Sequence, residues 1–272
     1  MKTGDCLDLG KRKLTFVEAP MVHWPDSMFT YCREEELLMP NDAFGQHIAT
    51  SQRFDDEVDA CSLMDEAAKY YANILTHLGQ IILKKIEDVL KMGLPVKMIA
   101  PSHGIIWRRD PMKIVNSYVS WAKNETVKKA VIVYETMWNS TEMMAKKIAE
   151  GLTASGVSVK LFDIAQSDRT EVIKEMLDAK GFCFGSSTHD NGMLPSIAGF
   201  MDLVKGLKPR GRIAAAFGSY GWGGGAVAGI EKIIKEAGID LAQPSISVKY
   251  VPDEAERRRC YEFGMDFAKK CI

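Results

Sequence analysis

The stretch "KKAVIVYETMWNSTEMMAKKIAEGL" (Lys128–Leu152) joins a β-branched apolar run directly to a helical pattern. The run Lys128–Glu135 is bounded by charged residues and predicts a buried strand. Met143–Ser155 has the spacing of a helix, which the sequence SGVSV brings to an end. The turn between them contains four short polar side chains, Thr136, Asn139, Ser140 and Thr141. The stretch therefore predicts a strand, a polar turn and a helix in immediate succession.

The rest of the chain beyond this stretch repeats the alternation of strand and helix. Further strands are predicted at Val157–Asp163, Gly181–Ser187, Arg212–Tyr220 and Asp240–Lys249. Helices are predicted after them, at Thr170–Ala179, Leu194–Lys205, Ala226–Ala237 and Asp253–Lys270. Five strands that alternate strictly with five helices predict a parallel sheet with right-handed crossovers and helices on both faces.

Two interpretations of the polar turn stay open on these residues alone. Ser140 or Thr141 could simply cap the helix. Alternatively, the hydroxyls and the first backbone N–H groups could hold a phosphate, because a helix N-terminus carries unpaired donors and roughly half a positive charge. A single cap does not require four such residues, which favours the phosphate.

Two further polar loops follow strands of the same predicted sheet. They are "GSSTHDNGMLP" (Gly185–Pro195) and "FGSYGWGGGAV" (Phe217–Val227). Ligands of open parallel sheets bind at the carboxyl ends of the strands, where these loops begin. Glycines let the backbone approach a flat ligand closely, and Tyr220 and Trp222 offer aromatic faces, although ordinary packing is the alternative for both rings.

The first half of the chain is less regular. Strands are predicted at Leu14–Glu18, Glu36–Met39 and Val96–Ala100. Asp65–Met92 predicts one long amphipathic helix, and Pro111–Asn124 a shorter one that Asp110 caps. The polar segment Lys123–Lys129 is the expected linker between the halves.

Three potential metal ligands in the first half each follow a predicted strand. They are His23, Asp42 and His103. Imidazole and carboxylate groups at strand ends are typical of iron or zinc sites, because the sheet holds them rigidly. His77 lies within the predicted long helix and is interpreted as a structural residue.

Composition limits the class of protein. The sequence of 272 residues, 46% hydrophobic and 26% charged, suits a soluble globular protein of one large domain or two ordinary ones. A formal net charge of −1 predicts no attraction to nucleic acid or to anionic membranes. There is no secretion signal and no run of 18 apolar residues, so a cytoplasmic location is expected. The six cysteines show no CxxC spacing and predict no disulfide framework.

The three loops of the second half together resemble those of the flavodoxin-like fold. "ETMWNST" is similar to its FMN-phosphate loop, and "SSTHDNG" and "GSYGWGGG" to the loops on either side of the isoalloxazine. In flavodoxins a glycine often follows the first threonine pair, and Met137–Trp138 replaces it here. The resemblance implies a doubly wound sheet of order 2-1-3-4-5 that binds FMN. The implied FMN-binding residues are Thr136, Met137, Trp138, Asn139, Ser140, Thr141, Ser187, Thr188, His189, Asp190, Asn191, Gly192, Ser219, Tyr220, Gly221, Trp222, Gly223 and Gly224.

The whole chain resembles the flavodiiron proteins, also called A-type flavoproteins. These join a metallo-β-lactamase-like diiron domain to a flavodoxin-like domain, and "HWPDSM", "LMPNDAFGQH" and "PSHG" carry the resemblance in the first half. It implies that residues 1–124 are the C-terminal half of an αββα metallo-β-lactamase-like domain and that 128–272 are the flavodoxin-like domain. By the same resemblance His23 and His103 would be iron ligands, and Asp42 a carboxylate that bridges two irons.

One departure from the family concerns the metal. Its other ligands belong to an H-x-E-x-D motif near the start of the domain, and this sequence contains no such motif. The expectation is a chain truncated at its N-terminus relative to the family. Three ligands do not hold two irons firmly, so the sequence leaves iron binding doubtful.

The resemblance also implies a function. The chain would pass electrons from a rubredoxin-like or flavin-reductase donor through FMN towards reduction of O2 or NO, in a head-to-tail homodimer. A separate N-terminal half-domain could supply the missing ligands. Two alternatives stay open: an FMN-only electron carrier whose first half is a scaffold without metal, and a non-redox binding module that holds no flavin.

Overall fold

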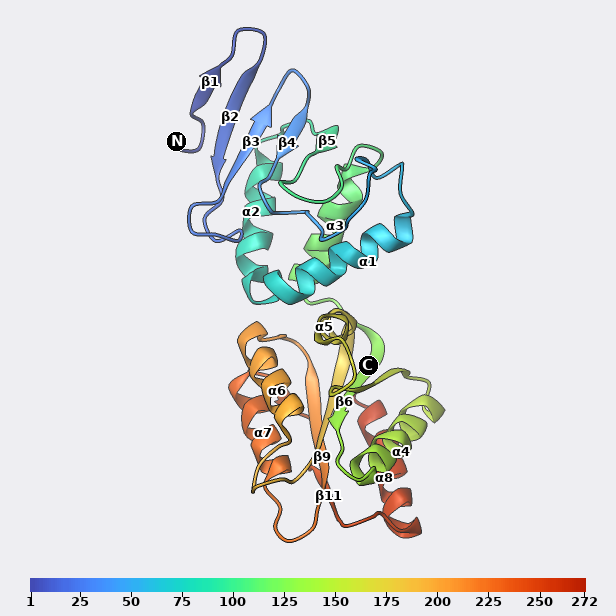
Figure 1. Cartoon of the computed structure of the whole chain (residues 1–272). Helices are drawn as coiled ribbons and strands as arrows, with labels where there is room; N and C mark the ends of the chain where they lie inside the picture. The colour runs from blue at the N-terminus through green and yellow to red at the C-terminus, as the bar shows by residue number, and fades with distance from the viewer. The chain divides into compact units, whose positions relative to one another are not determined.

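The computed structural model describes residues 1–272, and the chain divides into two compact units, Met1–Glu125 and Thr126–Ile272 (Figure 1). The division falls within the segment predicted as a linker. No helix in the structure is both long enough and apolar enough to cross a membrane.

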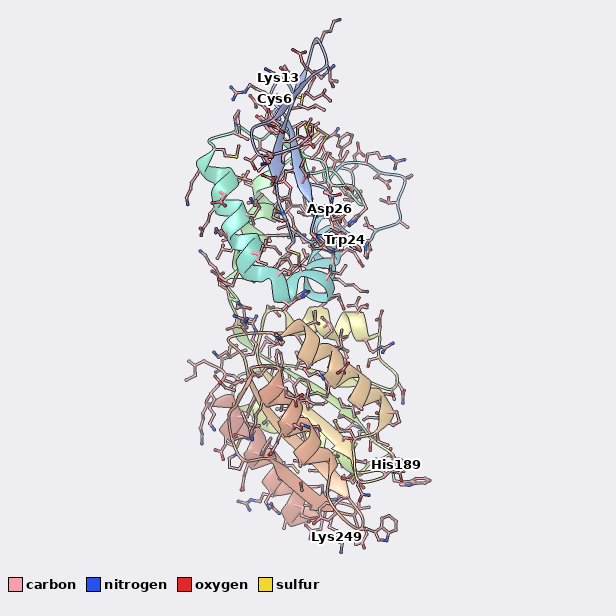
Figure 2. The ribbon with its side chains drawn as sticks, turned by 90° about the vertical axis from the view of Figure 1, so that its left-hand side faces the viewer. Cys6, Lys13, Trp24, Asp26, His189 and Lys249 are labelled. Atoms are coloured by element: carbon pink, nitrogen blue, oxygen red, sulfur yellow. The ribbon has the colours of Figure 1, made fainter.

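The first unit contains a five-stranded sheet of order β1-β2-β3-β4-β5. Its strands are β1 (Cys6–Asp8), β2 (Lys13–Glu18), β3 (Met28–Cys32), β4 (Leu37–Met39) and β5 (Met98–Ile99). Neighbours are antiparallel except β4 and β5, which are parallel. Figure 2 shows Cys6 and Lys13 on the exposed first hairpin, and Trp24 and Asp26 on the loop between β2 and β3.

The predicted long helix Asp65–Met92 is wrong, because the structure breaks it. It forms α1 (Ala60–Tyr70), a π-helical turn (Tyr71–Leu75), a 3₁₀ turn (Thr76–Leu78) and α2 (Gly79–Lys91). The Thr76 hydroxyl donates to the carbonyl of Ala72 at 2.8 Å, a contact that bends helices. The bend also brings Gly79 against α3 (Pro111–Ala122), where a Cβ on Gly79 would lie 3.4 Å from the Ala122 Cα atom. Asp110 occupies the N-cap position of α3 without a side-chain hydrogen bond.

The second unit contains a sheet in which all neighbouring strands are parallel. Its strands are β6 (Val127–Glu135), β7 (Ser158–Asp163), β8 (Ala179–Ser187), β9 (Ile213–Tyr220), β10 (Asp240–Leu241) and β11 (Ile246–Lys249). The order is β10-β9-β8-β6-β7, with β11 also on β9. The predicted last strand is thus two short ones, since Pro244 between them has no N–H to donate to a ladder. With β10 and β11 taken as one strand, the expected order 2-1-3-4-5 is confirmed.

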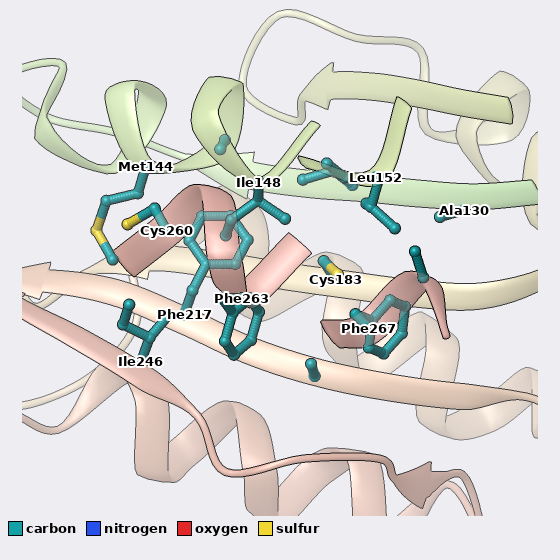
Figure 3. Close-up of a cluster of buried hydrophobic side chains, with 14 of the residues drawn as sticks. Ala130, Met144, Ile148, Leu152, Cys183, Phe217, Ile246, Cys260, Phe263 and Phe267 are labelled. Atoms are coloured by element: carbon teal, nitrogen blue, oxygen red, sulfur yellow. The ribbon is translucent and has the colours of Figure 1, made fainter. Parts of the chain in front are cut away.

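Helices cover both faces of this sheet (Figure 1). They are α4 (Ser140–Ala154), α5 (Arg169–Met176), α6 (Pro195–Leu207), α7 (Ala226–Glu236) and α8 (Glu254–Ala268). Helices α4 and α8 pack on one face of the sheet and form a hydrophobic core with it. Ile148, Phe217 and Phe267 in this core are wholly inaccessible to solvent (Figure 3). The two helices touch through glycines, since a Cβ on Gly151 would lie 2.1 Å from the Tyr261 carbonyl oxygen. This packing holds α4, which begins at Ser140 after the connection that follows β6.

Candidate functional site

The loops after β6, β8 and β9 meet at a cluster of three buried hydroxyl groups. The Thr141 Oγ1 atom lies 2.9 Å from the Ser187 Oγ atom and 2.9 Å from the Ser219 Oγ atom. Thr141 stands in the first turn of α4, Ser187 ends β8, and Ser219 is the penultimate residue of β9. The structure therefore brings together residues from all three of the loops that the sequence singled out.

The N-terminus of α4 has no side-chain cap. Asn139 is the N-cap residue, with a left-handed φ of 64° and no capping hydrogen bond. Neither Ser140 nor Thr141 caps the helix, because both already lie inside it. The left-handed position belongs to Asn139 rather than to Met137–Trp138, and asparagine tolerates that conformation better than most residues. The first turn of α4 thus keeps backbone N–H groups that no capping side chain occupies.

Thr136 carries the most informative atom of the site. Its Oγ1 atom is buried and has no hydrogen-bond partner. Leaving a buried hydroxyl unpaired costs about 1–3 kcal/mol, so such an atom needs an explanation. Thr136 is the first residue after β6, in the short connection that leads to the uncapped start of α4. An anion held at that turn would give the hydroxyl an acceptor.

The loop after β8 is held as a tight turn. His189 and Gly192 exchange two backbone hydrogen bonds of 3.0 and 2.9 Å, and Asp190 and Asn191 between them are left-handed. Thr188 joins the turn to its neighbours, because its N–H donates to the Ser219 carbonyl and its Oγ1 accepts from the Ala226 N–H. Figure 2 shows His189, together with Lys249 from the end of β11, at the extremity of the unit where the loops emerge.

The aromatic side chains around the three loops stand in solvent. Trp222 is 99% exposed and Trp138 is 81% exposed. Gly223 and Gly224 are exposed, and a Cβ on either would meet no atom within 4 Å. Ordinary packing therefore does not account for Trp222 or Trp138. A flat ligand laid beside them would remove apolar surface from water.

Sequence reasoning missed two side chains that support this site. The buried Glu135 Oε2 atom accepts from the Ile197 N–H at 2.8 Å, and the Ser186 Oγ atom accepts from the Leu194 N–H at 3.0 Å. Both attach the start of α6 to the strand ends. A carboxylate at the last position of a buried strand, ahead of a polar loop, was the available signal for Glu135.

The first unit brings the three predicted metal ligands together. The His23 Nε2 atom lies 3.5 Å from the Asp42 Oδ2 atom, and the His103 Nε2 atom lies 3.8 Å from the Asp42 Oδ1 atom. Each imidazole thus faces a different oxygen of one carboxylate. The two oxygens of Asp42 are therefore each next to a different imidazole.

Gln46, which the sequence did not suggest, holds His103 in place. The Gln46 carbonyl oxygen lies 3.1 Å from the His103 Nδ1 atom, which leaves Nε2 towards Asp42. The buried Gln46 side chain accepts from the Ile105 N–H at 2.7 Å and donates to the Phe44 carbonyl at 2.9 Å. A hydrogen bond at one ring nitrogen commonly orients the other for a metal.

His47 and Tyr70 complete the surroundings of the cluster. The Tyr70 ring lies 5.0 Å from the rings of both His47 and His103. Its hydroxyl is buried without a partner. Burial, and to a lesser degree the negative charge of Asp42, raise the pKa of Tyr70 well above the ordinary value of a tyrosine, so the hydroxyl keeps its proton.

The donor set fits part of a metal centre. No group of three or more His, Cys, Asp or Glu side chains is arranged to hold a single ion. His23, Asp42 and His103 instead offer each of two positions one imidazole nitrogen and one carboxylate oxygen. A stable iron or zinc site needs more ligands than two for each ion.

Comparison with known proteins relates both units to one family. The family model "Flavodoxin" matches residues 132–264. A nitric oxide reductase from Moorella thermoacetica is 54% identical over 271 residues, which cover 99% of this chain and 68% of the relative. An anaerobic nitric oxide reductase flavorubredoxin from Vibrio vulnificus is 45% identical over 272 residues, and the chain spans 55% of its length.

Solved structures of other proteins superpose on nearly the whole of this chain. The rubredoxin oxygen:oxidoreductase of Desulfovibrio gigas superposes with a TM-score of 0.97 at 37% identity, covering 100% of this chain and 68% of that one. The flavodiiron protein of Giardia intestinalis gives 0.94 at 35% identity, covering 98% and 66%. The expected fold, a flavodoxin-like domain after part of a metallo-β-lactamase-like domain, is confirmed. The chain belongs to the flavodiiron protein family.

Proposed function

We propose that the second unit binds FMN, with its phosphate at the start of α4. The observation that supports this best is the buried Thr136 hydroxyl, which has no hydrogen-bond partner and precedes the uncapped N-terminus of α4. A phosphate there would accept from that hydroxyl and from the free N–H groups of the first turn. The exposed ring of Trp222, in the loop after β9, would lie beside the isoalloxazine, with the loop after β8 on the other side, and the exposed ring of Trp138 belongs to the phosphate loop. Bound FMN supplies a centre that can take up an electron pair and release it one electron at a time.

The activity we propose is electron transfer towards the reduction of NO or O2. The names of the relatives refer to nitric oxide reductases and to a rubredoxin oxygen:oxidoreductase. A rubredoxin-like protein is accordingly the proposed electron donor, with a flavin reductase as the alternative. A head-to-tail homodimer and a cytoplasmic location belong to the same proposal.

For the metal, we propose that His23, Asp42 and His103 contribute to a diiron centre that residues beyond these three complete. Asp42 would bridge, since its two oxygens face different imidazoles. A separate half-domain is one source for the other ligands. The protein's role at this cluster is to hold the two imidazoles and the carboxylate in fixed positions, with Gln46 setting the orientation of His103.

The experiment for the flavin compares FMN with riboflavin, which lacks the phosphate. We expect Thr136→Val to weaken FMN binding by about 10- to 100-fold, because a hydrogen bond to a charged group contributes about 1.5–3 kcal/mol. Riboflavin affinity should not change. Flavin fluorescence quenching measures both affinities. Thr153→Val, at an exposed position near the end of α4, is the matched control. A protein that quenches neither flavin would refute FMN binding altogether.

One observation favours a second function. Because no three metal-binding side chains converge on a single ion, the chain could be an FMN electron carrier whose first unit is a scaffold. Iron analysis of the purified full chain separates the two functions. The diiron function predicts an iron content that approaches two per chain when the remaining ligands are present. It also predicts that Asp42→Asn loses this iron. Flavin without iron, even in the presence of a complementing half-domain, would establish the carrier.

A further inference from the structure

An apolar cavity lies in the first unit between the sheet and the helices α2 and α3. Every side chain that lines it is apolar, and the walls include Phe44, Ile99, Val89 and Val115. The volume of the cavity, counted as the space that the centre of a water molecule can occupy, is about 40 Å³. Phe44, Ile99 and Val115 are buried, so the inner wall of this space lies inside the fold.

Water is a poor occupant of this space. A buried water molecule needs two to four polar partners, and the lining side chains provide none. Engineered apolar cavities in other proteins stay dry and take up benzene or xenon for this reason. The chemistry of the lining therefore selects an apolar molecule.

The size of the space limits that molecule to a few atoms. One water-sized sphere needs about 10–15 Å³ by this measure, so 40 Å³ is room for about three. Sites for cofactors and other large ligands are about 300–1,000 Å³. A cofactor, a peptide or a lipid chain is thus excluded, whereas a diatomic gas fits.

The backbone of Phe44 and Gly45 separates the cavity from the group formed by His23, Asp42 and His103, called the Asp42 cluster below. Phe44 forms part of the wall and is fixed at both ends of its peptide: its N–H donates to the Tyr118 hydroxyl oxygen at 3.0 Å, and its carbonyl accepts from the Trp107 Nε1 atom at 2.9 Å. Gly45 follows, and a Cβ there would lie 2.5 Å from the imidazole of His103. The backbone of Phe44–Gly45 therefore has the cavity on one side and the cluster on the other.

The cavity also has an opening to solvent. Leu90, at the end of α2, is 54% exposed, and Met112, at the start of α3, is 40% exposed. Both are part of the lining. Flexible apolar side chains at the mouth leave a path that a small apolar molecule can use without meeting a charged group.

We propose that this cavity is a dry binding site for a small apolar gas. The gas enters between Leu90 and Met112 and is held across the Phe44–Gly45 backbone from the Asp42 cluster. Its relevance to NO or O2 rests on the proposed function. The occupancy itself does not, because it requires neither flavin nor iron.

Xenon tests the site in the full chain. We expect one xenon atom in the cavity in crystals under xenon pressure, and a saturable ¹²⁹Xe chemical shift in solution. Val115→Leu and Val89→Leu each add a methylene from a different wall and should lower xenon binding at least tenfold. Val119→Leu, one turn further along α3 and outside the lining, should bind xenon like the parent protein.

The filling variants also report on the space through stability. An added methylene in a packed core lowers the melting temperature, but one added to an empty cavity leaves it unchanged or raises it. Absence of xenon from the parent protein, ordered water in the cavity, or xenon binding in Val115→Leu and Val89→Leu as strong as in the parent protein would each overturn the proposal. A failure of FMN binding would leave it intact, so the two proposals are separable.

Discussion

Thr136 and Thr141, at the two ends of the proposed phosphate loop between β6 and α4, have different partners. Thr136 keeps a buried hydroxyl without a partner, whereas the Thr141 hydroxyl is shared between Ser187 and Ser219. The first is free to bind an anion, and the second holds three loops together. The sequence grouped both as phosphate donors, because identical residue types in one turn carry no information about which hydroxyl is already engaged.

Thr141→Val should therefore lower stability where Thr136→Val does not. Removing the Thr141 hydroxyl leaves two buried serines without their shared partner, which costs about 1–3 kcal/mol in the free energy of unfolding of the flavin-free protein. Removing the Thr136 hydroxyl eliminates an unpaired group and should leave that free energy unchanged or raised. Urea unfolding of the two flavin-free variants measures both values.

The effect on flavin binding should separate the same two variants. Thr141→Val should weaken FMN and riboflavin equally, since the hydroxyl cluster shapes the loops rather than contacting the phosphate. Loss of FMN alone in Thr141→Val would show instead that this hydroxyl contacts the phosphate directly.

At the proposed metal site, the sequence singled out His23, Asp42 and His103 but not Gln46. Histidines and carboxylates after strands have recognisable chemistry, whereas Gln46 acts through its backbone carbonyl and through side-chain bonds to the backbone of Phe44 and Ile105. Such contacts depend on the path of a loop, which residue type does not encode.

Among the elements, regular alternation was predictable and irregular geometry was not. The strands and helices of the second unit follow from their hydrophobic periodicity. In the first unit, β1 is short and wholly exposed and so has no apolar pattern, although β3 contains alternating buried Phe29 and Tyr31 and could have been recognised. The break between α1 and α2 arises from a back-bonded threonine and the packing of Gly79 on α3, which periodicity cannot reveal.

An ion pair joins the start of β6 to α5. The Lys129 Nζ atom lies 2.7 Å from the Glu175 Oε2 atom, and both side chains are largely buried. Burial alone would raise the pKa of Glu175, but Lys129, Lys160 and Lys174 together outweigh burial and hold that pKa below its ordinary value. Ionised Glu175 therefore contributes stability above the ordinary glutamate pKa, and this contribution is lost as the pH falls through the lowered value.

Glu175→Gln should accordingly destabilise the protein near neutral pH by about 1.5–3 kcal/mol, the range for a hydrogen bond to a charged group. The difference from the parent protein should shrink once the pH falls below that of an ordinary glutamate pKa. Urea unfolding at neutral and acidic pH gives both differences. Glu150→Gln removes an exposed partner of Lys147 and should cost less than about 1 kcal/mol. Equal effects of the two substitutions would contradict a specific role for the Lys129 pair.

For the whole molecule, the two units have separate architectures and the second has its own core. All loops of the proposed FMN site belong to Thr126–Ile272. We expect this segment, produced alone, to fold and to bind FMN within about twofold of the affinity of the full chain. Circular dichroism and flavin quenching measure the two properties. A segment that stays unfolded, or that folds without binding FMN, would mean that the first unit contributes to the site.

The exposure of Trp138 and Trp222 gives the chain an optical reporter of its own. Indoles in water emit at the long-wavelength edge of tryptophan fluorescence, where an oxidised flavin absorbs. Binding of FMN to the three loops should therefore quench the fluorescence of Trp138 and Trp222. Binding of a protein over these two side chains should shift their emission to shorter wavelength. Trp222→Phe and Trp138→Phe would divide the signal between the loop after β9 and the loop after β6, so loading of the cofactor and docking of a redox partner can be followed without a label.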